Sequence, residues 1–287
     1  MPSPSNVVKD QLVDRVKAAV GADVAAHFPG GSHTRRFADN LLASFPAWQV
    51  DELKGQLAAG GGSELTPSEN DKRRAHAPYS SAALAFNAFG RWLGDEPQLS
   101  VAGLAGFSDR LRVEGKAKIL HGGGTANLDV LLTGPGLTVG VESKLTETLN
   151  EHDPFPWATA YKTPEMRELL DEQWAAVLDA SISEVRQPKH LGLEQIIKHV
   201  LGLASQHSAS TRRLVYVYWE PLNAEAVDVV VKHRSELAEL RRRVAEASTA
   251  LHAVSYAELL DEWAGLDGPG WLPDHVDRLR ARYEFAI

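Results

Sequence analysis

Three charged residues occupy two short apolar segments that otherwise have the pattern of buried strands. Asp129 lies in the first segment, and Glu142 and Lys144 lie near the end of the second. Runs of apolar, β-branched residues bounded by turn residues are typical of such strands. A buried carboxylate is costly unless it is paired, protonated or bound to a metal ion. The presence of two acids in buried strands, with a lysine two residues after the second, therefore needs a chemical explanation.

The turn between the two segments predicts how these residues face one another. If a hairpin is centred on Pro135-Gly136, Asp129 falls opposite Glu142. Opposed Cβ atoms in an antiparallel pair lie about 4.5–5.5 Å apart, so the two carboxylates can share one cation. Lys144 comes to the same face as Glu142. Because a type II Pro-Gly turn is not a favoured two-residue hairpin turn, we expect a four-residue loop that keeps the same register.

The same spacing of acids and lysine occurs elsewhere in the chain, in a different context. Asp39 precedes Glu52 and Lys54 by the same separation, and Glu114-Gly115-Lys116 is another Glu-x-Lys sequence. Asp39 and Glu52 lie in segments of helical rather than alternating pattern, so we expect both on solvated helix faces. Only the Asp129 copy lies on two candidate strands joined by a turn.

The composition excludes several classes of protein. A hydrophobic fraction of 44% in 287 residues is ample for a large core. The absence of cysteine excludes disulfides and Cys-ligated zinc and fits a reducing, cytoplasmic location. We find no signal peptide and no apolar run that could span a bilayer, so no membrane partner is expected. The net charge of −8 argues against nonspecific coating of nucleic acid, although local basic groups leave contact with DNA open.

The expected elements place the charged hairpin in the middle of the chain. Alternation predicts a strand over 111–120 before the hairpin and another over 214–219 after it. Ser80 is a candidate N-cap for a short buried helix that ends near Trp92. Further helices are expected over 5–28, 33–59, 165–180, 191–204, 223–249, 255–264 and 274–284. We expect a helical segment over 1–59 and a second unit over 60–287, packed together as one compact body.

The order of these elements and the three charged residues resemble the PD-(D/E)xK nuclease superfamily. Its αβββαβ core matches a helix, three strands, a helix and a crossing strand, and its active-site pattern matches Asp129, Glu142 and Lys144. Leu128 replaces the usual proline before the aspartate, which the superfamily tolerates. The resemblance implies a restriction-endonuclease-like α/β fold, a mixed sheet flanked by helices with extra helices at both termini.

Several phrases resemble a narrower group of bacterial restriction-endonuclease-like proteins. They run in order from about residue 60 to residue 284 and include Gly61-Gly-Ser-Glu-Leu65, the stretch 79–92, Asn127-Leu-Asp129, Glu142-Ser-Lys-Leu-Thr-Glu147, Gln195-Ile-Ile-Lys-His199 and Tyr216-Val-Tyr-Trp-Glu-Pro221. This resemblance implies a metal-dependent endonuclease, a phosphodiester hydrolase that acts on DNA in restriction, defence or repair.

The resemblance also implies roles for individual residues. Asp129 and Glu142 would bind the metal ion together with the Ser143 carbonyl, and Lys144 would orient or deprotonate water and stabilise the charge of the transition state. Such an oxygen-only site suits Mg²⁺ or Mn²⁺. Because a lysine beside carboxylates keeps its charge, we expect Lys144 to act chiefly by electrostatics.

Other positions of the site are less narrowly defined. A third acid would be Glu114 or Glu64; nearness favours Glu114, and Glu64 belongs to the narrower group's phrase. Gln195 and Lys198 on the following helix would contact the substrate phosphate.

The sequence leaves several alternatives open. The hairpin could be an edge hairpin with a salt bridge, or the chain could be a catalytically silent member that binds nucleic acid or a protein partner. The intact Asp, Glu and Lys favour a nuclease. DNA and RNA are not distinguished, and cutting both strands of a duplex would suit a homodimer, although no feature of the sequence requires one.

Overall fold

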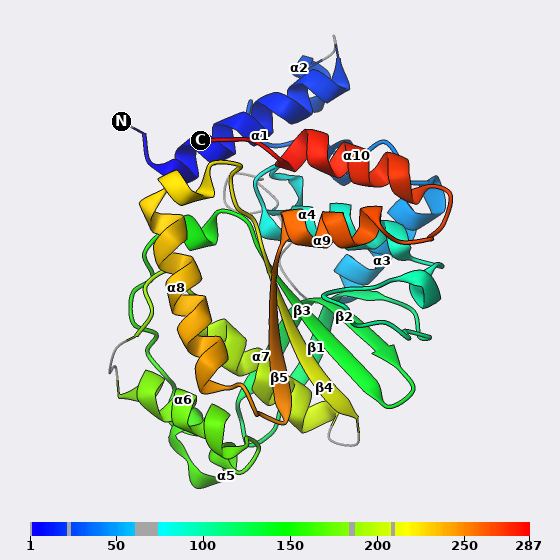
Figure 1. Cartoon of the computed structure of the whole chain (residues 1–287). Helices are drawn as coiled ribbons and strands as arrows, with labels where there is room; N and C mark the ends of the chain where they lie inside the picture. Colours follow the sequence, from blue (N-terminus) through cyan, green and yellow to red (C-terminus); the bar gives the residue numbers. More distant parts are fainter. Residues whose placement is uncertain (1, 22–23, 61–73, 184–186, 208–209) are drawn as a thin grey trace.

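A twisted mixed sheet forms the centre of the computed structural model (Figure 1). The structure describes residues 2–21, 24–60, 74–183, 187–207 and 210–287. In this part of the chain the sheet has five strands in sequential order: β1 (Arg112–Ile119), β2 (Gly124–Gly134), β3 (Leu137–Lys144), β4 (Thr211–Tyr218) and β5 (Thr249–Ser255). The first three are antiparallel, and β4 and β5 run parallel to β3. The predicted crossing of β4 to pair with the hairpin is confirmed, whereas β5 was not expected.

The hairpin has the predicted register but a tighter turn. Val130 pairs with Val141 and Gly134 with Leu137. The connection is therefore the two residues Pro135 and Gly136, and the expected four-residue loop is wrong. Gly136 has a φ of 70°, as the third position of a type II turn requires. Its carbonyl accepts the Thr211 N–H at 2.8 Å, so β4 helps to hold a turn that a lone hairpin would disfavour.

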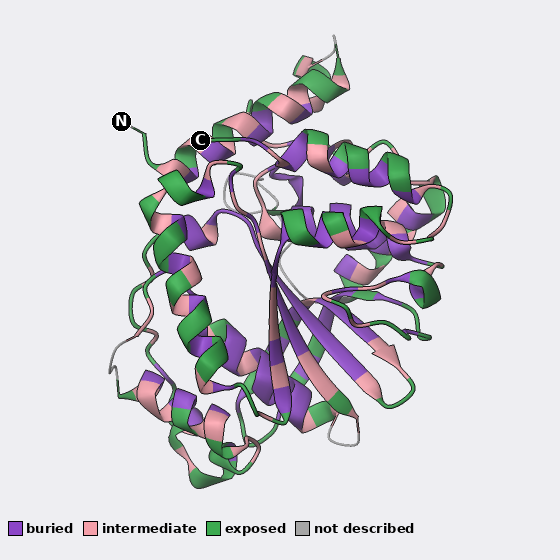
Figure 2. Cartoon of the chain, viewed as in Figure 1, coloured by how far each residue is buried: buried purple, intermediate pink, exposed green. Residues whose placement is uncertain are grey.

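Helices cover both faces of the sheet (Figures 1 and 2). One core lies between the sheet and α4, α9 and α10, and includes Phe86, Val130 and Val141. The other lies under α6, α7 and α8, and includes Leu128 and Ile197. The described α-helices are α1 (Pro4–Val20), α2 (Val24–His27), α3 (Ala47–Gly60), α4 (Ser81–Phe89), α5 (Pro164–Arg167), α6 (Glu172–Ile182), α7 (Leu193–Gln206), α8 (Asp228–Arg243), α9 (Tyr256–Ala264) and α10 (Leu272–Tyr283).

The N-terminal helices pack into the first of these cores. Val8 and Leu12 of α1 and Leu53 and Leu57 of α3 are buried in the same cluster as α4. The helix expected over 33–59 begins only at Ala47, and a short 3₁₀ helix, η1 (Phe37–Asn40), precedes it. None of the helices in the described ranges is long and apolar enough to cross a membrane.

Helix α7 lies closest to the hairpin, and its sequence explains how. Its apolar side is buried, and Gly202 faces the sheet. A Cβ at Gly202 would lie 2.8 Å from the Cβ of Ala117 on β1, so only glycine permits this approach. The close contact brings the polar N-terminal half of α7 over the ends of β2 and β3. Ser80 caps α4 through the Ala83 N–H, as predicted.

Candidate active site

The three charged residues of the hairpin come together where β2 and β3 stop pairing. Glu142 is 3% exposed and Lys144 is 4% exposed, while Asp129 is half-buried. The ladder ends at Val130 and Val141, and the next contact between the strands is made by a side chain. Asp129 Oδ2 accepts the Ser143 N–H at 2.7 Å. The aspartate therefore replaces one backbone bond of the sheet and is held against β3.

The carboxyl groups of Asp129 and Glu142 are close enough to shift each other's pKa. Burial and the Glu142 charge raise the pKa of Asp129 well above its usual range. Burial acts to raise the pKa of Glu142 as well, but Lys144, His199 and a side-chain hydrogen bond with Asp129 outweigh it and lower that pKa. The negative charge of one carboxylate makes ionisation of the other less favourable. A proton shared by the pair is therefore held more readily by Asp129 than by Glu142.

The Lys144 ammonium group bridges the hairpin and α7. Its Nζ lies 2.5 Å from Glu142 Oε1 and donates to Gln195 Oε1 at 2.5 Å. Burial acts to lower the pKa of Lys144, but the charges of Glu142, Glu147 and Asp129 outweigh it and raise that pKa. The ammonium group therefore stays charged, which suits electrostatic stabilisation and not general-base chemistry.

A further site residue, His199, was not among the predicted ones. Its Nδ1 lies 3.3 Å from Glu142 Oε2, and its Nε2 lies 3.1 Å from the Asn127 carbonyl oxygen. The Nδ1 contact is an ion-pair distance without the alignment of a hydrogen bond. Burial lowers the pKa of His199. The signal in the sequence was its position four residues after Gln195, which places both side chains on one face of a helix.

Lys198 has a different environment from Gln195. Its Nζ lies 3.9 Å from the centroid of the Phe155 ring, and burial lowers its pKa. Gln195 is exposed at the N-terminal end of α7, where it holds Lys144. Of the two residues expected to contact substrate phosphate, Gln195 thus lies within the carboxylate cluster, and Lys198 packs on the loop that follows β3.

Glu114 lies beside Asp129 on the neighbouring strand. The register of β1 and β2 places it opposite Asp129, between the pairs Val113–Val130 and Gly115–Leu128. It is 8% exposed, and its charge adds to the rise in the Asp129 pKa. Its φ of 52° is unusual for a residue other than glycine, and such strain concentrates at functional sites. Glu64, the other candidate third acid, lies outside the described residues.

Strand β2 changes its alternation at Asp129. Leu128 packs in the core under α7, whereas Val130 packs in the core under α4. Regular alternation would put both on one face. Strand β1 makes the matching change at Glu114, because Val113 and Ala117 also lie in different cores. Paired irregularities of this kind re-aim side chains next to functional sites.

Ser143 is held by contacts from the other face of the sheet. Its hydroxyl group lies 2.7 Å from the Tyr256 hydroxyl group and donates to the Ser81 carbonyl oxygen at 3.2 Å. Within a strand the N–H and C=O of one residue point to the same side. Since the Ser143 N–H points to Asp129, its carbonyl points to the same side of β3. This is the orientation that the predicted role as a backbone ligand needs.

Asp39, the acid in the other copy of the Asp…Glu-x-Lys spacing, was expected on a solvated helix face. This expectation is wrong. Asp39 lies on η1, and its side chain is only 5% exposed. Arg36 Nη2 lies 2.5 Å and His27 Nδ1 3.2 Å from its carboxylate oxygens. Glu52, by contrast, is on helix α3 and pairs with Arg110 at 3.3 Å. Asp39 and Glu52 therefore belong to separate ion pairs.

The donors at the hairpin fit a hard divalent cation. Within the described ranges, no group of three or more His, Asp or Glu side chains is arranged to hold a metal ion. Mg²⁺, however, is usually bound by one or two carboxylates and keeps several waters. Asp129 and Glu142 meet that requirement, and a bound cation would offset the repulsion between their charges.

One comparison with known proteins identifies the family. Residues 57–284 match the family model described as "Restriction Endonuclease associating with ARP". No curated protein and no solved structure was found to match. The match confirms the restriction-endonuclease-like resemblance, and the mixed sheet flanked by helices agrees with the expected fold. Membership of this family points to a nuclease that acts on nucleic acid. Because the match covers most of the chain, the protein belongs to the family of restriction endonucleases associating with ARP.

Proposed function

We propose that this protein is an Mg²⁺- or Mn²⁺-dependent endonuclease that hydrolyses phosphodiester bonds of duplex DNA at Asp129, Glu142 and Lys144. The observation that carries the proposal is the contact of two carboxyl groups with a charged lysine at the end of one hairpin. Burying an acidic pair with a lysine costs free energy of desolvation, which favours a functional reason for the cluster. Membership of a restriction-endonuclease family supplies the reaction class.

Each residue of the cluster has a distinct task in this proposal. Asp129 and Glu142, with the Ser143 carbonyl, would hold the metal ion. When bound, that ion would polarise the scissile phosphate and lower the pKa of water. Lys144, kept charged by Glu142, would stabilise the negative charge that develops on the phosphate.

The residues of α7 would orient the reacting groups. Gln195 holds the Lys144 ammonium group by its amide oxygen, and His199 lies against the second oxygen of Glu142. Both contacts come from one rigid helix, which suits a constellation that has to be held within a fraction of an ångström. Glu114 would contribute a third negative charge beside Asp129.

Support for a polyanionic substrate comes from the strands beside the acids. Lys116 and Lys118 of β1 are exposed, and they pair in the sheet with Asn127 and Thr125 of β2. Exposed basic residues next to a carboxylate site can neutralise phosphates on either side of the scissile bond. The chain's net charge of −8 makes such local positive charge necessary for binding DNA.

The experiment is a cleavage panel with plasmid and oligonucleotide DNA, with and without Mg²⁺ or Mn²⁺. We expect cleavage only with metal, and its loss in Asp129→Ala, Glu142→Ala and Lys144→Ala. Lys232→Met is the matched control, because Lys232 is exposed on α8 and far along the chain from the hairpin. Full cleavage in EDTA, or by the Lys144→Ala protein, would refute the mechanism. A matching panel with RNA decides between the two nucleic acids.

A further inference from the structure

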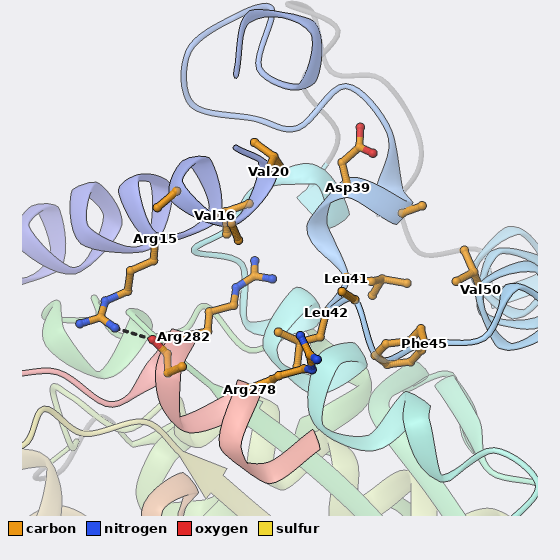
Figure 3. Close-up of a pocket in the computed structure, with 15 residues that line it drawn as sticks. Arg15, Val16, Val20, Asp39, Leu41, Leu42, Phe45, Val50, Arg278 and Arg282 are labelled. Carbon is orange, nitrogen blue, oxygen red and sulfur yellow. Dashed lines mark hydrogen bonds between the residues drawn. The ribbon is translucent and has the colours of Figure 1, made fainter. Parts of the chain in front are cut away.

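A second feature of the molecule lies away from the hairpin, between the N-terminal and C-terminal helices. A cavity of about 740 Å³ is bounded by α1, by the segment 38–45 and by α10. Its volume is in the range of small-molecule sites. Most of the residues that line it are apolar, among them Val16, Val20, Leu41 and Leu42 (Figure 3). None of the described residues assigned to the nuclease site lines this cavity.

The side chain of Arg282 provides a buried positive charge in this apolar cavity. Arg282 is 7% exposed, and Figure 3 shows its guanidinium group between Val16 of α1 and Leu41. Its Nη1 donates to the Asn40 carbonyl oxygen at 2.7 Å, and its Nη2 donates to Asn40 Oδ1 at 2.5 Å. Its Nε–H has no hydrogen-bond partner. Two of the five N–H groups of a guanidinium are therefore satisfied by neutral acceptors, and the rest are left over.

The acceptor Asn40 cannot turn away from Arg282. Its Nδ2 donates to the carbonyl oxygens of Ala75 and Ala77, at 2.9 and 3.1 Å. The amide is thereby locked with Oδ1 toward the guanidinium group. The arginine is therefore positioned by a rigid neutral group, which adds no negative charge beside the guanidinium.

Asp39 is the one acid among the described residues that line the cavity, and its carboxylate already has partners. Asp39 makes hydrogen bonds with Arg36 Nε and Nη2 and an ion pair with His27. In Figure 3 its carboxylate points away from Arg282. Among the described residues, no carboxylate forms an ion pair with Arg282. A buried charge is normally paired, so a guanidinium group without a carboxylate partner among the described residues suits an anionic ligand.

A second arginine adds positive charge at the edge of the cavity. Arg15 donates to the Ala281 carbonyl oxygen at 2.5 Å and lies over the Phe285 ring, with no ion pair in the described ranges. Arg278 also lines the cavity but pairs with Asp274 at 2.7 Å. The lining therefore combines apolar walls with an excess of positive charge.

We propose that this cavity binds a small carboxylate with an unbranched apolar body, its carboxylate on Arg282 and its chain along the apolar walls. The planar fork of a guanidinium group matches a carboxylate. The N–H groups of Arg282 Nη1 and Nη2 that do not bond to Asn40 supply the donors. The walls formed by Val16, Val20 and Leu41 bury the apolar body.

The test uses octanoate as the probe, with the full-length, metal-free protein and no DNA. Calorimetric titration and thermal unfolding are run with octanoate, octan-1-ol and octylammonium. We expect octanoate to bind and to raise the unfolding midpoint, octan-1-ol to bind at least tenfold more weakly, and octylammonium not to bind. Equal binding of octan-1-ol or octylammonium, or no binding of octanoate, overturns the proposal. Because no cleavage is measured, the outcome is independent of the proposed nuclease activity.

Two variants locate the site, and a third is the control. Arg282→Met should abolish octanoate binding, but it also removes the contacts with Asn40 and can impair folding. Ala19→Trp avoids this difficulty, because Ala19 is an exposed residue of α1 that lines the cavity, and a large side chain there would fill it. It should abolish binding as well. Arg242→Met, an exposed position on α8, should bind octanoate as the unchanged protein does. Unaltered binding by folded Ala19→Trp or Arg282→Met would place the ligand elsewhere and contradict the proposal.

Discussion

His199 and Lys144 contact the two oxygens of the Glu142 carboxylate. His199 Nδ1 lies 3.3 Å from Oε2, and Lys144 Nζ lies 2.5 Å from Oε1. The histidine ring also reaches the Asn127 carbonyl oxygen through Nε2. One side chain of α7 thus ties the end of β2 to the acid on β3. Glu142 is held on both sides, which fixes where its oxygens can meet a cation or a substrate.

Replacing His199 tests this positioning role. His199→Phe keeps a ring of similar shape but removes both nitrogen contacts, so we expect cleavage to fall about 10–100-fold, as is usual for residues that orient metal ligands. Since His199 is 3% exposed, kcat should fall while the KM for DNA changes little. His207→Phe, beyond the other end of the same helix, is the control. A loss confined to KM would mean that His199 contacts the DNA instead.

Asp129→Asn separates the effect of the acidic pair on the stability of the fold from its effect on cleavage. The pKa of Asp129 is raised in the folded protein, so its ionisation opposes folding as the pH rises above the value of an unfolded aspartate. The amide oxygen of asparagine can still accept the Ser143 N–H. We therefore expect the metal-free variant to be at least as stable as the unchanged protein at pH 7, with roughly 2 °C in Tm for each kcal/mol gained.

The same variant should lose both cleavage and the rise in Tm that Mg²⁺ causes by binding the folded state. Asp277→Asn, at an exposed position of α10, should change neither property. An Asp129→Asn protein that is much less stable without metal would show that the carboxylate serves the fold and not a cation.

The third acid can be identified by a pair of substitutions. Glu114→Gln keeps the shape of the side chain and removes its charge beside Asp129, so we expect cleavage to fall at least about tenfold with little change in Tm. Glu114→Gly also removes the strain of a φ of 52°, which glycine adopts freely. It tests whether the backbone conformation alone supports cleavage. If Glu64→Gln loses cleavage and Glu114→Gln keeps it, the assignment passes to Glu64.

Acid should destabilise the protein through two buried histidines outside the hairpin, His233 and His275. Burial lowers the pKa of His233 and of His275 to about 4, from 6.5. Their contribution to stability is complete above pH 6.5 and is lost as the pH falls toward 4, because the unfolded chain binds the extra protons. At about 1.4 kcal/mol per pKa unit, each loss is on the order of 3 kcal/mol.

Unfolding by denaturant at a series of pH values measures this loss. His275→Gln should flatten the slope between pH 6.5 and 4, while His121→Gln, at an exposed turn, should leave it unchanged. A stability that is constant over this interval would mean that the buried histidines are compensated by other groups.

The hairpin was readable from the sequence because local rules determine it. Pro135-Gly136 marks the turn, and the apolar pattern of the flanking segments allows only one register. The tighter turn was missed because the Thr211 N–H, which holds it, comes from a strand distant in sequence. β5 was missed for a related reason. Its apolar alternation is weak, and the segment is a strand because it pairs in parallel with β4.

The candidate site also combines features set by local sequence with features set by contacts between distant segments. The sequence predicted Asp129, Glu142 and Lys144 as one cluster because type, spacing and strand context coincide within one short segment. His199, the burial of Asp39 and the cavity around Arg282 depend on how helices pack on the sheet and on one another. The sequence alone determined the hairpin, its register and its charged residues. Only the tertiary structure decided which side chains hold those charges, because these contacts join segments far apart in the chain.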